Sequence, residues 1–451
     1  MTSALTITAL PYSPAPLETF SRLRQRPGAV LLDSGRPAAS GRYDIMSSDA
    51  LATLEIMPNG EPVFNSSQLQ IPETLAGDPT AQQQWMLDQL PICPLSSELP
   101  FLGGLIGYWS YDLGRDHLAI SSQHTHVTRL PMARLGLYDW CITFDHETQQ
   151  AWLVATPQRR KQVIQWLSAP TAPGTPFQLT SPFAAELSQT EYTKRFTIVQ
   201  RYIRAGDCYQ INLAQRFSAN YEGDVWQAYL RLRKATPTPF SGFMAWKNQA
   251  VLSLSPERFI QCRDRVVETR PIKGTRPRGA TPAEDLALAE QLLSSTKDRA
   301  ENVMIVDLLR NDLGRVCDPG TIRVPQLCQL ESYPNVHHLV SVVQGQLSKQ
   351  HTPLSLLSAA FPGGSITGAP KIRAMQIIDE LEPCQRSVYC GSLGYIDTRG
   401  SMDTSIAIRT MVADAGTLHV WGGGGLVADS KAEEEYTETL DKIRHLIGAL
   451  E

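Results

Sequence analysis

The chain has 451 residues, of which 42% are hydrophobic and 19% charged, so it can bury a large core and is not a disordered protein. Its 41 basic and 45 acidic residues leave a net charge of -4, which argues against nucleic acid as the main partner. Its apolar runs are short, and we expect neither a membrane span nor a secretory signal. The eight cysteines form no Cys-x-x-Cys pair, so we expect reduced thiols in a cytoplasmic protein.

Residues 1–170 are predicted to form an N-terminal subdomain built mostly of short strands, with one helix over residues 80–90. Residues 171–185 continue a run rich in proline, glycine and threonine, and we interpret them as a spacer. Residues 186–451 follow as the second region, which contains the candidate functional residues.

A capping box opens the first predicted helix of the second region. Ser188 is followed three residues later by Glu191, and Gly206 is placed to end the helix. Leucine, valine and methionine residues at helical spacing predict one long helix over residues 284–310. Other helices are expected over 225–234, 353–360, 370–381 and 431–448, and strands over 209–213 and near 391 and 421.

A short repeat links the two regions. The sequence Gly-Leu-Ile-Gly-Tyr at residues 104–108 is echoed by Ser-Leu-Gly-Tyr at residues 392–395. The similarity predicts two similar strands, one in each of two sheets.

The stretch at residues 269–276, Thr-Arg-Pro-Ile-Lys-Gly-Thr-Arg, follows two predicted strands. Residues 251–259 alternate like a strand, and residues 266–269 are expected to pair back after a turn. This pairing places Glu257 and Lys273 near the ends of neighbouring strands. An acid and an amine nucleophile would then share one cleft, although a lysine in such a place is more often a solvated strand end.

Two pairs of carboxylates lie at helical spacing. Asp298 and Glu301 share one helix face, and Glu435 and Glu438 share a face of the last helix. Facing pairs of carboxylates would repel one another unless a cation lay between them, and Mg²⁺ prefers such hard oxygen ligands. The alternative is that acids near helix N-termini only complement the helix dipole.

Glycine-rich segments and one histidine pair complete the candidate residues. The run at 422–425 allows a backbone to approach an anionic ligand closely. The loop at 362–371 lacks the Gly-Lys-Ser/Thr of a phosphate-binding loop, yet it can present Ser365 and backbone amides to a carboxylate. His337 and His338 are adjacent in a predicted strand, so only one of them can face a given site.

Together, these motifs resemble the chorismate-utilising enzymes over residues 190–445. The resemblance implies an α+β fold, in which two large, mostly antiparallel sheets pack as a sandwich with helices outside and the site in a cleft between them. The matching segments are 255–259, 271–275, 297–302, 307–312, 336–341, 362–371, 402–410 and 429–439.

One position divides this family. Lysine in the Pro-Ile-x-Gly-Thr motif, here Lys273, is typical of the aminodeoxychorismate synthases, whereas anthranilate synthases usually carry alanine there. The resemblance implies a large subunit that converts chorismate and ammonia into 4-amino-4-deoxychorismate, on the route to p-aminobenzoate and folate. Anthranilate synthase component I and an inactive tryptophan-binding regulatory subunit are the alternatives; a nucleotide-binding protein is excluded by the missing phosphate-loop lysine.

The resemblance implies specific roles for three residues. Lys273 attacks C2 of the chorismate ring as the C4 hydroxyl leaves, and Glu257 protonates the departing oxygen. Ammonia then adds at C4 and expels the lysine. His338 is a third candidate catalytic residue. Because the lysine must be neutral and the glutamate protonated near pH 7, we expect both pKa values to be shifted towards neutrality.

The resemblance also implies a cofactor and a substrate pocket. Mg²⁺ would be held by Glu301, Glu435 and Glu438, with Asp298 near it or joined through water. Gln210 stands where water-using relatives carry a lysine base, and its amide cannot activate water, which suits ammonia as the nucleophile. The residues expected around the substrate are Gln210, Thr275, Ser365, Tyr389, Arg409, Gly423, Gly425 and Lys442.

Two partners are expected besides chorismate. None of the cysteines stands in an amidotransferase setting, so ammonia is predicted to come from a separate glutamine amidotransferase subunit, docked transiently. Residues 31–35 resemble a segment that lines a tryptophan pocket in related subunits. Ser34 and Tyr43 are the residues that we assign to this possible pocket.

Overall fold

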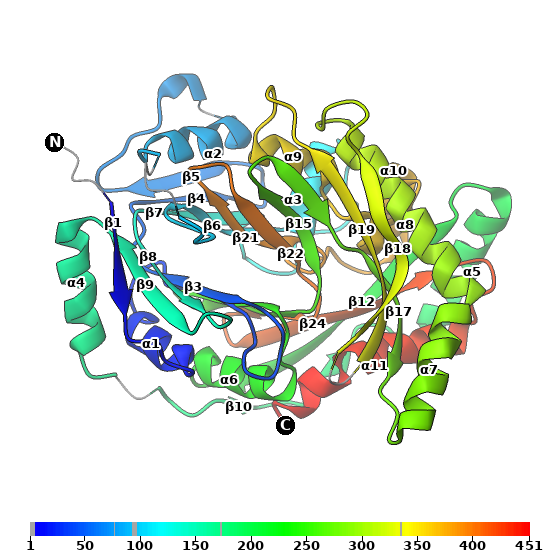
Figure 1. The fold of residues 1–451 in the computed structure, drawn as a ribbon. Coiled ribbons are helices and arrows are strands. Elements are labelled where there is room, and N and C mark those ends of the chain that lie inside the picture. The colour runs from blue at the N-terminus through cyan, green and yellow to red at the C-terminus, as the bar shows by residue number, and fades with distance from the viewer. Residues whose placement is uncertain (1–4, 76, 93–96, 172–173, 334–335) are drawn as a thin grey trace.

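The computed structural model describes residues 5–75, 77–92, 97–171, 174–333 and 336–451, which form two large sheets with helices outside (Figure 1). The sheets have 13 and 11 strands, and the pairs within both are antiparallel. The predicted α+β sandwich is therefore confirmed.

The larger sheet joins strands from distant parts of the chain. From edge to edge its order is β1 (Thr6–Leu10), β9 (Gln150–Ala155), β8 (Cys141–Asp145), β3 (Tyr43–Ser47), β2 (Val30–Asp33), β13 (Phe240–Trp246), β14 (Gln249–Ser255), β23 (Thr410–Asp414), β24 (Thr417–Leu426), β12 (Gln210–Glu222) and β10 (Gln178–Leu179), with β11 (Ala184–Ala185) and β20 (Gly368–Ala369) also paired to β12.

The smaller sheet also joins strands from distant parts of the chain. Its order is β17 (Ile272–Pro277), β19 (Val336–Gln346), β16 (Val266–Thr269), β15 (Arg258–Arg263), β22 (Met402–Ile406), β21 (Ser392–Asp397), β6 (Gly104–Trp109), β7 (Ala133–Tyr138), β4 (Ala52–Ile56) and β5 (Pro62–Ser66), with β18 (Arg323–Ser332) also paired to β19.

Helices cover the outer faces of the two sheets (Figure 1). They are α1 (Pro16–Leu23), α2 (Pro79–Asp88), α3 (Tyr111–His117), α4 (Pro157–Ser168), α5 (Gln189–Ala205), α6 (Val225–Ala235), α7 (Pro282–Ser294), α8 (Thr296–Gly314), α9 (Pro353–Ala360), α10 (Lys371–Leu381) and α11 (Ala432–Gly448), with short 3₁₀ turns η1 (Glu73–Leu75) and η2 (Gly364–Ile366).

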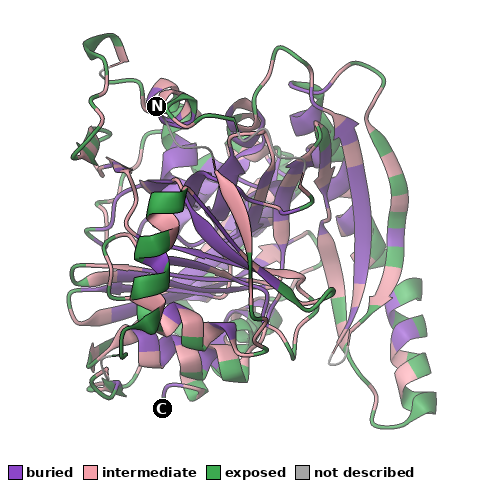
Figure 2. Cartoon of the chain, turned by 60° about the vertical axis from the view of Figure 1, so that its left-hand side comes forward, coloured by how far each residue is buried: buried purple, intermediate pink, exposed green. Residues whose placement is uncertain are grey.

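Apolar strand residues form two cores. One joins both sheets to α9 and α10, and the other packs the larger sheet against α1, α4, α6 and α11. Aromatic rings dominate the second core, where the centroids of Trp226 and Phe243 lie 5.0 Å apart. Buried residues follow the strands in Figure 2, while exposed residues lie on the outer faces of the helices.

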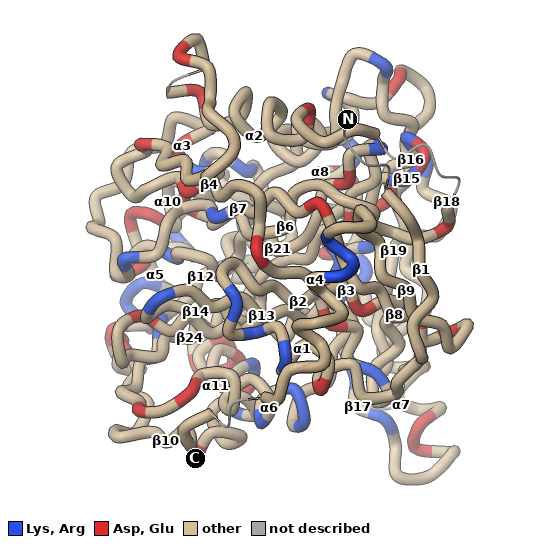
Figure 3. Tube along the Cα trace, turned by 90° about the vertical axis from the view of Figure 1, so that its left-hand side faces the viewer, with Lys and Arg blue, Asp and Glu red and all other residues tan. Residues whose placement is uncertain are grey.

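Acidic and basic residues are interspersed along the Cα trace drawn in Figure 3. Among the described helices, none combines the length and apolar character that crossing a membrane would require. Seven cysteines are buried free thiols, whereas Cys93 lies outside the described residues.

The predicted division at residues 171–185 does not separate the sheets. Strand β2, from the N-terminal segment, pairs with β13, and β6 pairs with β21. Strands from residues 1–170 and from residues 186–451 therefore lie side by side in both sheets, so the division remains a prediction about the sequence alone.

The repeat at residues 104–108 and 392–395 was expected in two different sheets, and this expectation is wrong. Strands β6 and β21 are neighbours in the smaller sheet, with Gly107 opposite Gly394. On the other side of β21, a Cβ on Gly394 would lie 2.2 Å from the Asp403 carbonyl oxygen, so the glycine lets β21 pack closely against β22.

Gly394→Ala should therefore lower the free energy of unfolding by about 1–3 kcal/mol, because its methyl group clashes with backbone atoms that cannot rotate away. Urea unfolding followed by circular dichroism measures the change. Gly448→Ala is the control, since a Cβ there meets nothing within 4 Å and should leave stability almost unchanged. Equal urea concentrations at the unfolding midpoints of the two variants would contradict the packing argument.

The helix predictions have two outcomes. The capping box is confirmed: Ser188 Oγ accepts from the Glu191 N–H, the Glu191 carboxylate accepts from the Ser188 N–H, and Gly206 ends α5 in the left-handed conformation. The single helix expected over 284–310 is wrong, because Ser295 adopts an extended ψ of 106° and divides it into α7 and α8. The Ser295 hydroxyl accepts from the Asp298 N–H and so caps α8.

The run at residues 251–259 is also two elements rather than one strand. β14 ends at Ser255 in the larger sheet, and β15 begins at Arg258 in the smaller sheet. Pro256 and Glu257 cross between them, because proline cannot donate a ladder hydrogen bond. The predicted return after residue 263 is confirmed, since β15 and β16 form an antiparallel hairpin.

Candidate active site

The side chains of Lys273 and Glu257 meet at a turn from a third element. Lys273 Nζ donates to the Ser365 carbonyl oxygen at 3.3 Å, and Ser365 Oγ donates to Glu257 Oε1 at 3.3 Å. Lys273 and Glu257 were expected near the ends of neighbouring strands, but β19 and β16 lie between β17, which carries Lys273, and β15, which begins just after Glu257. Ser365, in η2, therefore joins the two groups.

The backbone around Lys273 departs from regular strand geometry, and this departure sets the direction of the Lys273 side chain. The register between β17 and β19 shifts between Ile272 and Thr275, and Gly274 has a φ of 79°. A Cβ on Gly274 would lie 3.0 Å from the Asp298 side chain, so the strand passes close to α8. Glycine is the residue that adopts this left-handed conformation at least cost.

Burial shifts the pKa values of both groups towards neutrality. Glu257 is 7% exposed, and burial raises the pKa of its carboxyl to about 7 against the attraction of Lys273. Burial likewise lowers the pKa of Lys273, while Glu301 and Glu257 oppose that change. Both directions are those that an acid and an amine nucleophile working at neutral pH require.

The carboxylates of α8 and α11 surround the same space. Burial raises the pKa values of Glu301 and Glu435, and the negative charge of Glu438 adds to both shifts. A Cβ on Gly424 would lie 3.1 Å from Glu435 Oε2 and 3.3 Å from Glu438 Oε1, so both carboxylates lie over this glycine. Asp298 is instead paired with Arg276 at 3.2 Å.

These carboxylates fit a magnesium ion by their chemistry. Glu435 Oε1 accepts from Ser430 Oγ at 2.6 Å, whereas Glu435 Oε2 is buried with no hydrogen-bond partner among the described residues. Across the described part of the chain, no three acidic, histidine or cysteine side chains already converge as a metal cage. Mg²⁺ commonly takes only one or two protein carboxylates and completes its shell with water and substrate oxygens.

Gln210 and the glycine strand form one wall of the site. Gln210 is fully buried at 0% exposure, and both of its amide atoms lack a partner among the described residues. A Cβ on Gly425 would lie 2.4 Å from Gln210 Nε2. An unpaired buried amide has a high desolvation cost, so its position suits a polar ligand.

Histidine and threonine face each other from paired strands. Thr275 Oγ1 and His338 Nδ1 are 2.9 Å apart, and burial lowers the pKa of His338 to about 4 with help from Arg409. His338 is therefore a neutral imidazole at pH 7. His337 faces away and contacts Ser332 and Asp285, as their alternation in a strand predicts.

The remaining predicted substrate residues differ in their surroundings. Lys442 Nζ donates to the Gly423 carbonyl oxygen at 2.7 Å and pairs with Glu438 at 2.7 Å. Tyr389 is buried and stacks on Trp421 with an angle of 7° between the rings. Arg409 is partly exposed, has a φ of 50° and joins Lys442 in lining the large cavity.

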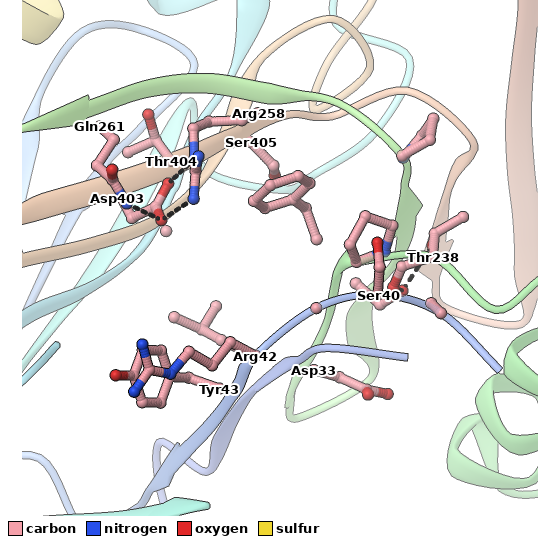
Figure 4. Close-up of a pocket in the computed structure, with 18 of the residues that line it drawn as sticks. Asp33, Ser40, Arg42, Tyr43, Thr238, Arg258, Gln261, Asp403, Thr404 and Ser405 are labelled. Carbon is pink, nitrogen blue, oxygen red and sulfur yellow. Dashed lines mark hydrogen bonds and ion pairs between the residues drawn. The ribbon is translucent and has the colours of Figure 1, made fainter. Parts of the chain in front are cut away.

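A cavity of about 1180 Å³ lies between the sheets (Figure 4). Tyr43 lines it, together with Asp33, Thr238 and the Arg258–Asp403 ion pair. Ser34 is buried beside it at 1% exposure. The backbone N–H of Ser34 donates to Asp44, and its hydroxyl has no partner among the described residues.

The same cavity reaches four of the predicted catalytic and substrate-binding residues. Thr275, His338, Arg409 and Lys442 belong to its lining. Lys273, Glu257 and Ser365 are not among the lining residues, so the cavity adjoins only part of the candidate active site.

Sequence reasoning missed two residues of the site. Gly424 keeps the space beside Glu435 and Glu438 open, and Ser430 orients Glu435. The run of four glycines at 422–425 was noticed, but only the folded structure shows that Gly422 and Gly424 face α11. Ser430 precedes the acidic helix as a capping serine would, so its contact with a carboxylate could not be distinguished from a cap.

Comparison with known proteins gives a consistent result. Residues 41–448 match the family described as chorismate binding enzyme. The chain is 47% identical to aminodeoxychorismate synthase component 1 of Klebsiella aerogenes, over 98% of each chain. It is 46% identical to the Salmonella typhimurium protein of that name, over 99% of this chain and 98% of the relative. The solved anthranilate synthase component I from Streptococcus pneumoniae superposes with a TM-score of 0.79 at 30% identity, covering 90% and 92% of the two chains.

Proposed function

We propose that this chain, which belongs to the chorismate binding enzyme family, is the component of an aminodeoxychorismate synthase that acts on chorismate. The observation that carries the proposal is the placement of Lys273 beside Glu257, both bound to Ser365. An anthranilate synthase activity is the weaker alternative, because a side-chain amine then has no role at this position.

We further propose a covalent mechanism. The Lys273 amine forms a bond to C2 of the chorismate ring, the two ring double bonds shift, and the bond from C4 to its hydroxyl breaks. Glu257 gives its proton to the departing oxygen, which leaves as water. Ammonia then bonds to C4, the double bonds shift back, and the bond between C2 and Lys273 breaks. One proton from the added ammonia returns to Glu257, so the acid is restored.

The carboxylates support a magnesium site in this proposal. Glu301, Glu435 and Glu438 would hold the ion, with Asp298 in reach through water. Bound there, Mg²⁺ would take the ring carboxylate of chorismate and draw negative charge towards it. Arg409 and Lys442 would bind the substrate carboxylates, since a guanidinium and an ammonium suit such anions.

The geometry at Gly424 makes a prediction about the metal. Gly424→Ala places a methyl group against Glu435 Oε2 and Glu438 Oε1, so the Mg²⁺ concentration for half-maximal activity should rise about 10- to 100-fold. Magnesium titration by calorimetry should show the same loss of affinity without substrate. Gly314→Ala on α8 is the control, because its Cβ would meet only Ile322 at 3.8 Å. An unchanged magnesium affinity in the Gly424→Ala variant would contradict the assignment of Glu435 and Glu438 as metal ligands.

Product analysis tests the proposed reaction. The protein is incubated with chorismate, magnesium chloride and ammonium chloride, and the products are separated by liquid chromatography and identified by mass. Aminodeoxychorismate is the expected product. Anthranilate would identify the alternative enzyme, and unchanged chorismate would favour the regulatory subunit without catalysis.

A partner subunit should supply the ammonia. The word component in the names of the relatives implies a second subunit for those proteins. We propose a glutamine amidotransferase for this chain, because the reaction consumes ammonia. The pure chain should use ammonium salts but not glutamine, and glutamine-dependent turnover by the chain alone would refute the partner.

The cavity between the sheets supports a bound amino acid, with tryptophan as our proposed ligand. Its lining combines aromatic and apolar residues with the buried carboxylate of Asp33 and the polar groups in Figure 4. Denaturing the purified protein and measuring released amino acids by mass spectrometry tests occupancy. Equilibrium dialysis with tryptophan should show binding to the parent protein and weaker binding to the Thr238→Val variant. Equal affinity of the two proteins would show that tryptophan does not bind in this cavity.

A further inference from the structure

A buried arginine fastens the turn that touches both Lys273 and Glu257. Arg386 is 1% exposed, and its Nη1 donates to the Ile366 carbonyl oxygen at 2.8 Å. The side-chain amide of Asn212 donates to the same oxygen at 2.9 Å. Because Ile366 follows Ser365 directly, these two bonds fix the peptide next to Ser365.

Arg386 is itself held by a carboxylate four residues earlier in the chain. Glu382 accepts from Arg386 Nε at 2.9 Å and from Nη2 at 2.6 Å. Glu382 also accepts from the Ala214 N–H at 2.7 Å, and Arg386 Nη2 donates to the Asn212 carbonyl oxygen at 2.5 Å. The pair is therefore attached to β12 as well as to the turn, and the Tyr111 ring lies 4.7 Å from the guanidinium.

Stability alone explains such a pair poorly. Removing two charges from water costs roughly as much as their attraction returns, so a buried ion pair contributes little to folding. A bidentate arginine supplies geometric definition instead, since its planar fork fixes direction as well as distance.

We propose that Arg386, held by Glu382, is a positioning residue for catalysis. It keeps the turn Gly364–Ile366 where Ser365 presents its carbonyl oxygen to the Lys273 amine and its hydroxyl to Glu257. This inference deepens the proposed function and rests on it. A neutral amine that donates one N–H to Ser365 directs its lone pair elsewhere, and the turn thereby sets the line along which Lys273 approaches the ring.

Arg386→Lys provides the main test. The ammonium preserves a positive charge beside Glu382, but it cannot form the fork and reach Ile366 together. The kcat should fall about 10²-fold, because a displacement of about 1 Å in an attacking group has effects of this size. The KM for chorismate should stay within about threefold of the parent value, since Ser365 is the only predicted substrate-binding residue in this turn.

Arg216→Lys is the matched control on the same strand that Glu382 contacts. Arg216 makes a bidentate bond to Glu186, at 3.1 Å for both contacts, and neither residue contacts η2. Its kcat should remain within about twofold of the parent. Equal losses in the two variants, or a loss confined to KM, would overturn the positioning role.

A second variant covers the case in which Arg386→Lys does not fold. Asn212→Ala removes the other side-chain donor to Ile366 and leaves the buried ion pair intact. It should lower kcat about tenfold with the same unchanged KM, because one of two bonds to that peptide remains. A parental kcat in this folded variant would overturn the proposal.

Lysine labelling gives a readout that does not depend on the reaction. Modification of Lys273 by a small amine-reactive reagent is followed by mass spectrometry as a function of pH. The charged groups facing this amine are Glu257, Glu301, Glu438 and Lys442. Loosening of the turn admits water, so the labelling profile in Arg386→Lys should move to higher pH, towards that of an ordinary lysine.

The two proposals fail differently. An unchanged Lys273 labelling profile in Arg386→Lys would overturn the positioning role whatever product the enzyme makes. Absence of aminodeoxychorismate in the parent protein would overturn the proposed function, while a shifted profile would still show that Arg386 places the lysine.

Discussion

Lys273→Met should lower the rate of aminodeoxychorismate formation by at least ~10³-fold, because the side chain keeps similar bulk but loses the attacking nitrogen. Without the nucleophile the covalent adduct cannot form, so the second step, in which ammonia displaces the lysine, has no substrate. Product formation is measured with chorismate, magnesium and ammonium chloride, and chorismate binding by calorimetry checks that the site remains intact.

A second experiment traps the intermediate in the same pair of proteins. Mixed with chorismate and magnesium but no ammonia, the parent protein should gain one covalent adduct, and peptide mapping should place it on Lys273. The Lys273→Met protein should gain none. An adduct on another residue, or near-parental turnover by the methionine variant, would exclude this nucleophile.

Glu257→Gln should lower kcat about 10²- to 10⁴-fold, the range expected when a positioned general acid is lost. The parent needs Glu257 protonated, and burial raises the pKa of this carboxyl to about 7, so its activity should fall as pH rises through about 7. The parent also needs Lys273 neutral, so activity should decrease as the pH is lowered and the amine takes up a proton. Glutamine cannot ionise, and the descending limb near pH 7 should therefore disappear in the variant.

Stability distinguishes lost chemistry from lost folding in this variant. A carboxyl whose pKa is higher in the folded than in the unfolded state destabilises the protein progressively as pH rises from the unfolded value to about 7. Removing the charge should leave Glu257→Gln at least as stable as the parent at pH 8. A lower thermal midpoint there, or a retained limb near pH 7, would assign that limb to another group.

Local signals were sufficient to predict much of the fold. The Ser188 capping box and the hairpin between β15 and β16 depend on residues a few positions apart, and both are present. The helix over 284–310 failed because the Ser295 break lies inside a pattern that is helical on both sides. Hydrophobic periodicity alone does not reveal a single capping residue that separates two consecutive helices.

Long-range placement could not be derived from local patterns. Gly107 and Gly394 lie opposite each other across a gap of nearly three hundred positions, a pairing that neither short motif specifies. Glu257 and Lys273 were predicted to share a cleft, and in the structure both contact Ser365, a residue that the strand pattern did not indicate as their link. The roles of Gly424 and Arg386 become visible only when α11 and β12 are placed beside them.

The interleaving of N-terminal and C-terminal strands has a consequence for dissection of this protein. Expressed alone, residues 186–451 would leave β13 and β21 without the partners β2 and β6, which exposes hydrogen-bonding edges in the middle of both sheets. A truncated catalytic fragment should therefore aggregate, and chimaeras joined within residues 171–185 should fold only when the two halves come from compatible parents. In the structure, strands from both segments share each sheet, so we expect the chain to unfold as one unit.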